Sequence, residues 1–405
     1  MKFHVRNPKD FPKKMNTSVD HMAFYLDHPD FFINLISKHY PLSYKQIKKY
    51  AGLLNWHLVS SNINIQWNFD LIADMIEYLK WDELTINQSA FKDITLLDVF
   101  SDRIIWFENI DNFGFSFSAN IGMPWTIDFI KRFENRIDFN ELSSNRSVQW
   151  TEELIDRYWG KWNTYELAAN ESIPWSLSLF DKYIDESYLK DFLVEINPRI
   201  FGNLDLVEKY IDKIDWYHVS SNPNLPWQEK NLITLWADKI NWCGISKNET
   251  IFKLDPEFFN KHLNIWEFDK SKYFAFLSEN QSIKFDKELI DRYLRFWDWQ
   301  DLCDNPGVPW TQQLIEHFSN MVYWGGNVDT FITEDQDGNS IPPIPAKHFQ
   351  YGLISNTSIP WSIDIIRNFE SKIDFTSLWK NHAVWDKGFK DCINDDFLDA
   401  AVRII

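Results

Sequence analysis

The chain of 405 residues contains one 25-residue phrase twice in direct succession, and this repetition constrains its fold more than any other feature. TIDFIKRFENRIDFNELSSNRSVQW (126–150) is followed at once by TEELIDRYWGKWNTYELAANESIPW (151–175), so that Leu142 aligns with Leu167. A fixed period between 20 and 50 residues is typical of solenoids and other repeat arrays. We therefore expect an all-α solenoid of about a dozen short helix-turn-helix repeats.

Each repeat begins with the pattern of a capped helix. A tryptophan precedes a serine or threonine, as in Trp150-Thr151, and such a hydroxyl can accept hydrogen bonds from the first backbone N–H groups of a helix. Apolar residues then recur at helical spacing, for example Leu289, Ile290 and Tyr293. The opening of each repeat therefore predicts an amphipathic helix.

A second, shorter element has the form Asp-Trp-x-x-Leu-Ser-x-Asn, with Val in place of Leu at Asp215–Asn222. The aspartate suits the N-cap of a single helical turn, and the asparagine is expected to end that turn in a left-handed conformation. A proline usually precedes the next tryptophan and disfavours helix before it, which predicts an extended return. One repeat alone cannot bury its aromatic face, but stacked neighbours can.

The repeat pattern divides the chain into three segments. Residues 1–43 are predicted to form a helical N-terminal cap, residues 44–385 the solenoid, and residues 386–405 a C-terminal capping helix. Insertions interrupt the pattern near 101–118, 254–275 and 325–350. Two β-prone stretches around Asp337-Gly338 predict a β-hairpin at 328–345.

The aromatic content has two interpretations. The chain holds 21 Trp, 33 Phe and 15 Tyr, and large rings are easily placed between stacked helices. We expect most tryptophans to be core residues, with Trp216 as a representative whose removal destabilises the fold. The alternative is that rings left outside the core form a binding surface.

Several classes of protein are disfavoured. No apolar run approaches the 20 residues of a transmembrane helix, and the N-terminus lacks the apolar region of a secretory signal. The three cysteines are too scattered for a disulfide framework or a metal cluster. Seven Asn-x-Ser/Thr sequons occur, and we interpret them as turns of the repeat. A cytoplasmic protein is expected, or one in the host cytoplasm if the source is viral.

The sequence shows no recognised catalytic layout. It contains no glycine-rich phosphate loop, HExxH, Cys-x-x-Cys or GxSxG pattern. Isolated histidines such as His57 and His218 are expected on the exposed side of the short helices. The run 334–339 resembles part of a calcium loop but lacks its first and last ligand positions, so a turn explains it equally well. We therefore expect no enzyme, cofactor or metal site.

The net charge of the chain indicates which class of partner it can bind. The net charge is −18, although residues 1–50 hold nine Lys/Arg and only four Asp/Glu. An acidic body repels nucleic-acid phosphates, so direct nucleic-acid binding is disfavoured. The same charge suits a basic protein partner, while solubility alone would also explain it.

The repeat phrase Pro-Trp-[Ser/Thr]-x-x-Leu-Ile-x-x-[Phe/Tyr]-x-x-x-[Ile/Trp]-Asp-[Trp/Phe]-x-x-Leu-Ser-x-Asn resembles that of Trp-rich tandem-repeat proteins of bacteria and large DNA viruses. The resemblance covers about residues 44–385 and implies an interaction protein, with no catalytic residue to carry over. In such arrays insertions gather on one face and often bind partners. The candidate partner-binding residues therefore come from the insertions: Phe115, Phe117, Trp266, Tyr273, Phe331, Glu334, Asp335 and Asp337.

Three hypotheses for function follow. The first is a non-enzymatic scaffold that binds a protein partner through an acidic concave or insertion-bearing surface. The second is a binder of a nucleotide or another small ligand, in which exposed rings stack on the ligand. The third is an acidic decoy that imitates DNA and binds a basic nucleic-acid-binding protein in its place. A counter-defence factor would be such a decoy.

Overall fold

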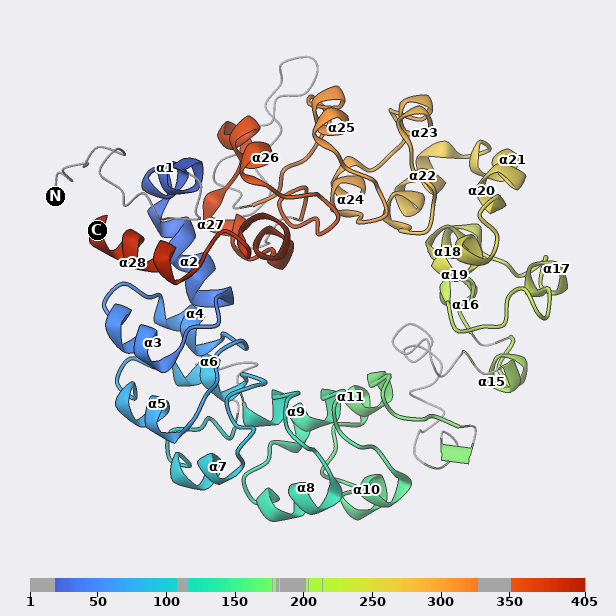
Figure 1. The fold of residues 1–405 in the computed structure, drawn as a ribbon. Coiled ribbons are helices and arrows are strands. Elements are labelled where there is room, and N and C mark those ends of the chain that lie inside the picture. The colour runs from blue at the N-terminus through green and yellow to red at the C-terminus, as the bar shows by residue number, and fades with distance from the viewer. Residues whose placement is uncertain are drawn as a thin grey trace, which may run out of the picture. The chain divides into compact units, whose positions relative to one another are not determined.

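The protein is all-α, as predicted, in the residues that the computed structural model describes: 19–107, 116–176, 178–179, 182, 202, 204–212, 214–326 and 351–404 (Figure 1). The chain divides into two compact units. Unit 1 comprises Met1–Tyr40, Lys49–Leu54 and His262–Ile405, and unit 2 comprises Pro41–Lys48 and Asn55–Lys261. The β-hairpin predicted at 328–345 lies outside the described residues.

Unit 2 consists mainly of helices of four to seven residues, and we call the helix that opens each repeat the long helix and the one that follows it the short helix. Its elements are α4 (Trp56–Ser60), α5 (Phe69–Asp74), α6 (Trp81–Thr85), α7 (Thr95–Val99), the 3-10 turn η2 (Phe117–Ala119), α8 (Ile127–Phe133), α9 (Phe139–Ser144), α10 (Glu152–Arg157), α11 (Thr164–Ala169), α15 (Leu204–Lys209), α16 (Trp216–Ser221), α17 (Leu232–Leu235), α18 (Trp242–Lys247), α19 (Glu249–Leu254) and α20 (Phe258–Lys261). Helix α3 (Tyr44–Tyr50) begins in unit 2 and ends in unit 1.

Unit 1 contains both ends of the described chain. Its elements are α1 (Val19–Asp27), α2 (Pro29–His39), α21 (Leu263–Trp266), α22 (Lys270–Glu279), α23 (Lys287–Arg292), α24 (Trp299–Asp304), α25 (Gln312–His317), α26 (Ile363–Asn368), η5 (Glu370–Lys372), α27 (Phe375–Leu378), the π-helical turn η6 (Val384–Phe389) and α28 (Asp395–Ile404). Helix α1 ends at Asp27 and α2 begins at Pro29, a residue that suits the first position of a helix.

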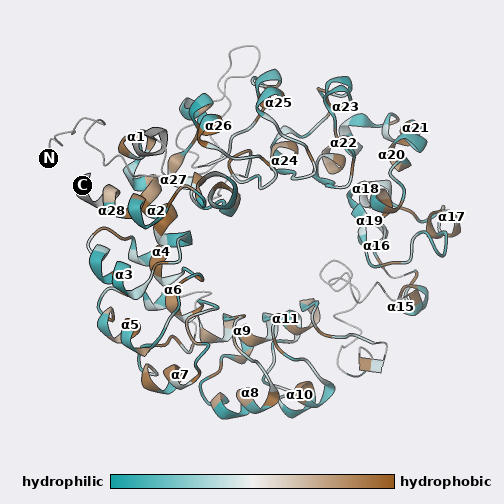
Figure 2. Cartoon of the chain, in the orientation of Figure 1, coloured by the Kyte–Doolittle hydropathy of each residue, from teal (hydrophilic) through white to brown (hydrophobic). Residues whose placement is uncertain are grey.

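The predicted helix caps are confirmed. The Thr126 hydroxyl accepts from Phe129 N at 3.2 Å and the Thr151 hydroxyl from Leu154 N at 3.1 Å, which satisfies donors that a helix start otherwise leaves free. Helices α8 and α10 then place apolar residues inward and hydrophilic residues outward (Figure 2). Capping and helical periodicity together fix the longer helix of the repeat.

The predicted ending of the short helices is wrong. Asn145 has φ −70° and ψ 114°, and Asn170 has φ −73° and ψ 106°, so both are extended and not left-handed. Asparagine is therefore not present in the phrase for its tolerance of positive φ. Its contacts with the preceding repeat, described below, give the reason.

Tryptophans pack between repeats. In three repeats the ring that opens the short helix lies against a ring at or just after the end of the next long helix, with centroid distances of 4.9 Å for Trp56–Tyr78, 5.0 Å for Phe139–Tyr158 and 5.3 Å for Trp299–Phe318. All tryptophans lie in the described residues, and Trp159 alone is mainly exposed, at 46%. The predicted core role of the tryptophans is confirmed.

Trp216→Ala is expected to lower the free energy of unfolding by about 2–3 kcal/mol, somewhat less than truncation of a fully buried Trp. The half-buried Trp216 ring lies 5.2 Å from Trp236, and its Nε1 donates to Ile211 O at 3.3 Å. Urea denaturation measures the loss, with Trp159→Ala as the exposed control. Equal midpoints for the two variants would show that Trp216 faces solvent.

Candidate functional site

A row of buried asparagines connects successive repeats. Asn170 Nδ2 donates to two carbonyl oxygens of the preceding repeat, Ser143 O at 2.9 Å and Asn145 O at 3.2 Å. Its Oδ1 accepts from Ser172 N, two residues further on, at 2.9 Å. The same pair of Nδ2 bonds is made by Asn87, Asn120, Asn145, Asn248, Asn356 and Asn381. We call these six residues, together with Asn170, the asparagine ladder.

The hydroxyl two residues before each asparagine forms a second connection. Ser143 Oγ accepts from Asn163 N at 3.0 Å, and Ser118 Oγ accepts from Asp138 N at 2.9 Å, in each case from the start of the next short helix. Cys303 occupies this position in one repeat, where its Sγ accepts from Tyr323 N at 3.2 Å. The Leu-Ser-x-Asn phrase is thus a connector between repeats, because buried backbone groups need such partners.

The ladder also explains the repeated sequons. The asparagines of six of them, at 87, 145, 170, 248, 280 and 356, are at most 4% exposed. For five of these, Nδ2 donates to the preceding repeat. A folded repeat therefore holds these amides away from solvent, in agreement with their interpretation as structural turns.

Two insertions leave the array at the same position of the repeat. In a regular repeat, Leu142 N donates to Asp138 O at 2.9 Å, which closes the first turn of the short helix. Phe117 N makes this bond to Ile105 O at 2.6 Å, and Leu353 N makes it to Tyr323 O at 3.0 Å. Residues 107–116 and 325–352 therefore each replace two residues of a short helix, the counterparts of Asn140 and Glu141.

The array continues past the longer of these insertions. Gly325 and Gly326 have φ of 79° and 108°, which a side chain would disfavour, and a Cβ on Gly352 would lie 2.7 Å from Gly325 N. The chain therefore departs and returns at one point. Asn356 Nδ2 still reaches Cys303 O at 2.7 Å and Asn305 O at 3.0 Å, so the ladder is unbroken across the insertion.

The short helices of residues 41–176 form an acidic row. Helices α4, α6, α9 and α11 lie along one side of this segment, and α5, α7, α8 and α10 along the other (Figure 1). Together with η2, the short helices contain four carboxylates and no Lys or Arg: Asp82, Glu83, Glu141 and Glu166. We call the side chains of α4, α6, η2, α9 and α11 that reach solvent the short-helix face.

The other side of this segment carries carboxylates paired with cations of neighbouring repeats. Asp74 lies 3.0 Å from Lys48 Nζ, and Asp98 lies 2.6 Å from Arg132 Nη2. These pairs are exposed, so each contributes at most about 1 kcal/mol to stability. Helices α5, α7, α8 and α10 together contain seven carboxylates and three Lys or Arg residues, so they differ from the helices of the short-helix face in carrying cations and not in net charge.

Three of the sequence-predicted site residues lie in the described residues, Phe117 in unit 2 and Trp266 and Tyr273 in unit 1. Phe117 and Trp266 are fully buried, so neither ring offers surface to a partner, and Tyr273 is half-buried with its ring 5.9 Å from Trp266. Phe117 occupies the position of Leu142, an apolar core position of the repeat. Five candidates, namely Phe115, Phe331, Glu334, Asp335 and Asp337, lie outside the described residues, as does the run 334–339. The sequence analysis missed that two insertions replace the same two residues of a short helix, the counterparts of Asn140 and Glu141.

The histidines singled out in the sequence are both on short helices. His57 on α4 is exposed, as expected. His218 on α16 is half-buried, and its Nε2 lies 3.6 Å from Asp215 Oδ2 at the start of the same helix. His218 is therefore less exposed than predicted.

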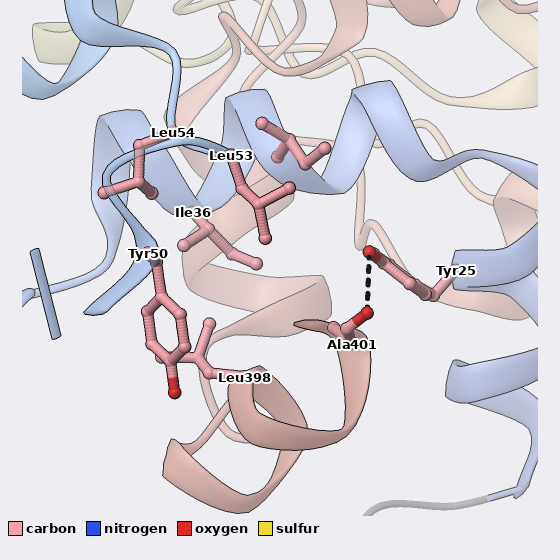
Figure 3. Close-up of a pocket in the computed structure, with 8 residues that line it drawn as sticks. Tyr25, Ile36, Tyr50, Leu53, Leu54, Leu398 and Ala401 are labelled. Atoms are coloured by element: carbon pink, nitrogen blue, oxygen red, sulfur yellow. Dashed lines mark hydrogen bonds between the residues drawn. The ribbon is translucent and has the colours of Figure 1, made fainter. Parts of the chain in front are cut away.

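A small cavity in unit 1 has an apolar lining (Figure 3). Its volume of about 30 Å³ has room for one or two water molecules and not for a stacked nucleotide. Tyr25 on its wall donates to Ala401 O at 3.5 Å, and burial raises the pKa of its hydroxyl to about 12. The cavity therefore holds a neutral phenol among aliphatic side chains.

The described residues give no sign of a reactive centre. Among them, no group of three or more His, Cys, Asp or Glu side chains is arranged to hold a metal ion. Burial raises the pKa of the Cys303 thiol to about 12, which disfavours the nucleophilic thiolate. No described helix has both the length and the apolar character needed to cross a membrane.

Comparison with protein-family models, curated proteins and solved structures found no match. The resemblance to Trp-rich tandem-repeat proteins therefore stays a hypothesis.

Proposed function

We propose that the protein is a non-enzymatic repeat scaffold that binds a basic protein partner through the short-helix face. The observation that carries the proposal is the shared position at which residues 107–116 and 325–352 replace part of a short helix. Insertions that replace the same position of the repeat are often where repeat arrays bind their partners. The acidic residues at the same positions of other repeats suit a basic partner.

Some positions of the repeat connect neighbouring repeats while others vary on the surface, and this difference supports a binding role. The repeated tryptophan, serine and asparagine side chains are used to connect one repeat to the next, which leaves them little surface. The second position of the short helix varies instead, with Asp82, Asn140 and Tyr165 in three repeats of unit 2. A rigid scaffold with variable surface positions is the arrangement that repeat proteins use for recognition.

Neutralising the short-helix face is expected to weaken partner binding by about tenfold or more, because charge complementarity across an interface is lost. The test variant is Asp82→Asn/Glu83→Gln/Glu141→Gln/Glu166→Gln. A matched control removes the same charge from the opposite side: Asp70→Asn/Glu77→Gln/Asp128→Asn/Glu153→Gln, all exposed in the structure. Affinity capture from extracts of the source cells, quantified by mass spectrometry, compares both variants with wild type.

A partner recovered by wild type and control, but lost from the face variant, supports the proposal. Binding that is lost equally from both variants would reflect net charge alone and would contradict it. The captured interaction should also weaken as salt rises, since exposed charges are screened. If the partner proves to be a nucleic-acid-binding protein displaced by DNA, the decoy function becomes the more specific description.

A further inference from the structure

The N-terminal helices pack directly on the last repeats within unit 1. Phe32 on α2 lies 5.3 Å from Phe389 and 5.7 Å from Phe397, measured between ring centroids. His28 stacks on Phe375 of α27 at 4.0 Å, and its Nε2 lies 2.9 Å from Glu370 Oε1. We call this interface, between α1–α2 and residues 367–401, the seam. It joins segments at least 340 residues apart in the sequence.

His39 occupies the position of a ladder asparagine in the seam. Each ladder amide donates to the carbonyl two residues before the preceding asparagine, as Asn381 does to Ile354 O at 2.9 Å. The next acceptor in this series is Trp379 O, two residues before Asn381. His39 Nε2 lies 3.1 Å from Trp379 O. The end of α2 therefore docks on the last repeat as a further repeat would.

The sequence supports this equivalence. Ile36-Ser37-Lys38-His39 matches the phrase Leu142-Ser143-Ser144-Asn145 in its apolar residue and its serine, and Ile36 and Ser37 are as buried as their counterparts. The last residue differs. His39 has an imidazole, which can ionise, where the other repeats have the amide of asparagine. The two sides of this contact are also distant in the sequence, so no short connecting segment holds them together.

The surroundings of His39 disfavour its charged form. The ring is half-buried and parallel to Trp385, with centroids 6.0 Å apart. Burial lowers the pKa of His39, and Lys38 on its own helix and His382 of the last repeat lower it further. The Trp379 carbonyl and Asp386 oppose this shift without cancelling it. The carbonyl can only accept, so the neutral ring carries its proton on Nε2.

We propose that the seam is a pH-sensitive closure in which His39 is the titrating group. A neutral His39 acts as the ladder asparagines do, by donating to the preceding repeat. An imidazolium keeps the Nε2 donor but places a charge in a half-buried site that also faces Lys38 and His382. Acidification therefore releases the N-terminal helices from the last repeat, while the ladder contacts made by asparagine amides do not titrate.

The direction of the effect follows from proton linkage. Because the pKa of His39 is lowered when the seam is closed, the open form binds more protons as pH falls below about 6.5. The closing equilibrium constant then falls by up to about tenfold per pH unit, until the pH passes the lowered pKa. Above pH 7 it does not change through this group.

The choice of variant distinguishes the effect of His39 from the effects of the other ionisable groups in the seam. His28 pairs with Glu370, Tyr40 donates to Asp395 Oδ1 at 2.6 Å, and Asp399 accepts from Lys49 and Tyr50. These groups are the same in wild type and in His39→Asn. The difference between the two proteins therefore reports on His39 alone, and asparagine is the residue that the ladder uses elsewhere.

The test is hydrogen exchange of the amides in α1, α2 and α28 at pH 7.5 and pH 5.5, each referenced to an unstructured peptide at the same pH. We expect His39→Asn and wild type to be protected alike at pH 7.5. At pH 5.5 wild type should lose protection by up to about tenfold more than the variant. His57→Asn, which alters an exposed histidine, should behave as wild type.

Two results would overturn the proposal. One is an equal pH response in wild type and His39→Asn, which would assign any opening to the other groups of the seam. The other is a loss of protection in His39→Asn at pH 7.5, which would show that position 39 does not accept a ladder asparagine. His39→Ala should expose the seam at both pH values.

Discussion

Asn145→Ala lowers the free energy of unfolding of its repeat by about 3 kcal/mol or more, because each buried partner left without a hydrogen bond costs about 1–3 kcal/mol. Asn145 Nδ2 donates to Ser118 O at 2.7 Å, and its Oδ1 accepts from Ser147 N at 2.9 Å. Alanine leaves both groups without their partner. Hydrogen exchange of α9 and α11 amides, together with urea denaturation, measures the loss.

Asn140→Ala is the matched control, since Asn140 lies on the same short helix but is exposed. It accepts one bond, from Asn163 Nδ2 at 2.6 Å, and its loss should cost less than 1 kcal/mol. Asn145→Asp keeps the size and the acceptor but removes both amide donors, so it should destabilise at least as much as alanine. Similar effects at positions 140 and 145 would contradict the role assigned to the asparagine ladder.

Phe32→Ala destabilises the seam by about 3–5 kcal/mol, the usual cost of truncating a buried phenylalanine. Its side chain is 0% exposed and its ring is surrounded by Phe24, Phe31, Phe389 and Phe397. We expect hydrogen-exchange protection to fall in α1, α2 and α28 and to be retained in α9 and α11. Repeat proteins allow such local loss because each repeat contacts mainly its neighbours.

Phe268→Ala is the control for this variant, because Phe268 belongs to the same unit and is 87% exposed. It should change stability by less than about 0.5 kcal/mol. If Phe32→Ala left the exchange of α28 unchanged, the N-terminal helices would not be packed on the last repeats in solution. If it unfolded α9 and α11 as well, stability would be shared along the whole chain.

The local features of the repeat could be predicted because they depend on near neighbours in sequence. Thr126 and Thr151 cap helices that start directly after them, and the apolar spacing within each repeat shows which side is buried. The core role of the tryptophans followed from the need of each repeat to bury its aromatic face. These predictions rested on capping and periodicity alone.

The connections between repeats could not be predicted in the same way. Asn170 contacts carbonyl groups 25 and 27 residues earlier, and no local propensity reports such a bond. The asparagine was therefore interpreted as a helix ending. Phe117 was assigned to an insertion, although the bond from its N–H to Ile105 O places it at the core position of Leu142.

The N-terminal segment left a signal that could have been recognised. Residues 1–43 were predicted to lack the repeat, yet Ile36-Ser37-Lys38 repeats most of the ladder phrase. His39 in place of asparagine concealed the match. A terminal segment that matches the repeat phrase except at its last residue can thus indicate a further, altered repeat.

The most direct test of the proposed binding function is carboxyl footprinting of the protein with and without its captured partner. Carbodiimide labelling, read by mass spectrometry, should fall at Asp82, Glu83, Glu141 and Glu166 when the partner is bound. Labelling of the exposed carboxylates Asp70, Asp128 and Glu153 on the long helices, and of Glu77 just after α5, should remain as in the free protein. Protection of the second group with unchanged labelling of the first would contradict the assignment of the short-helix face as the binding surface.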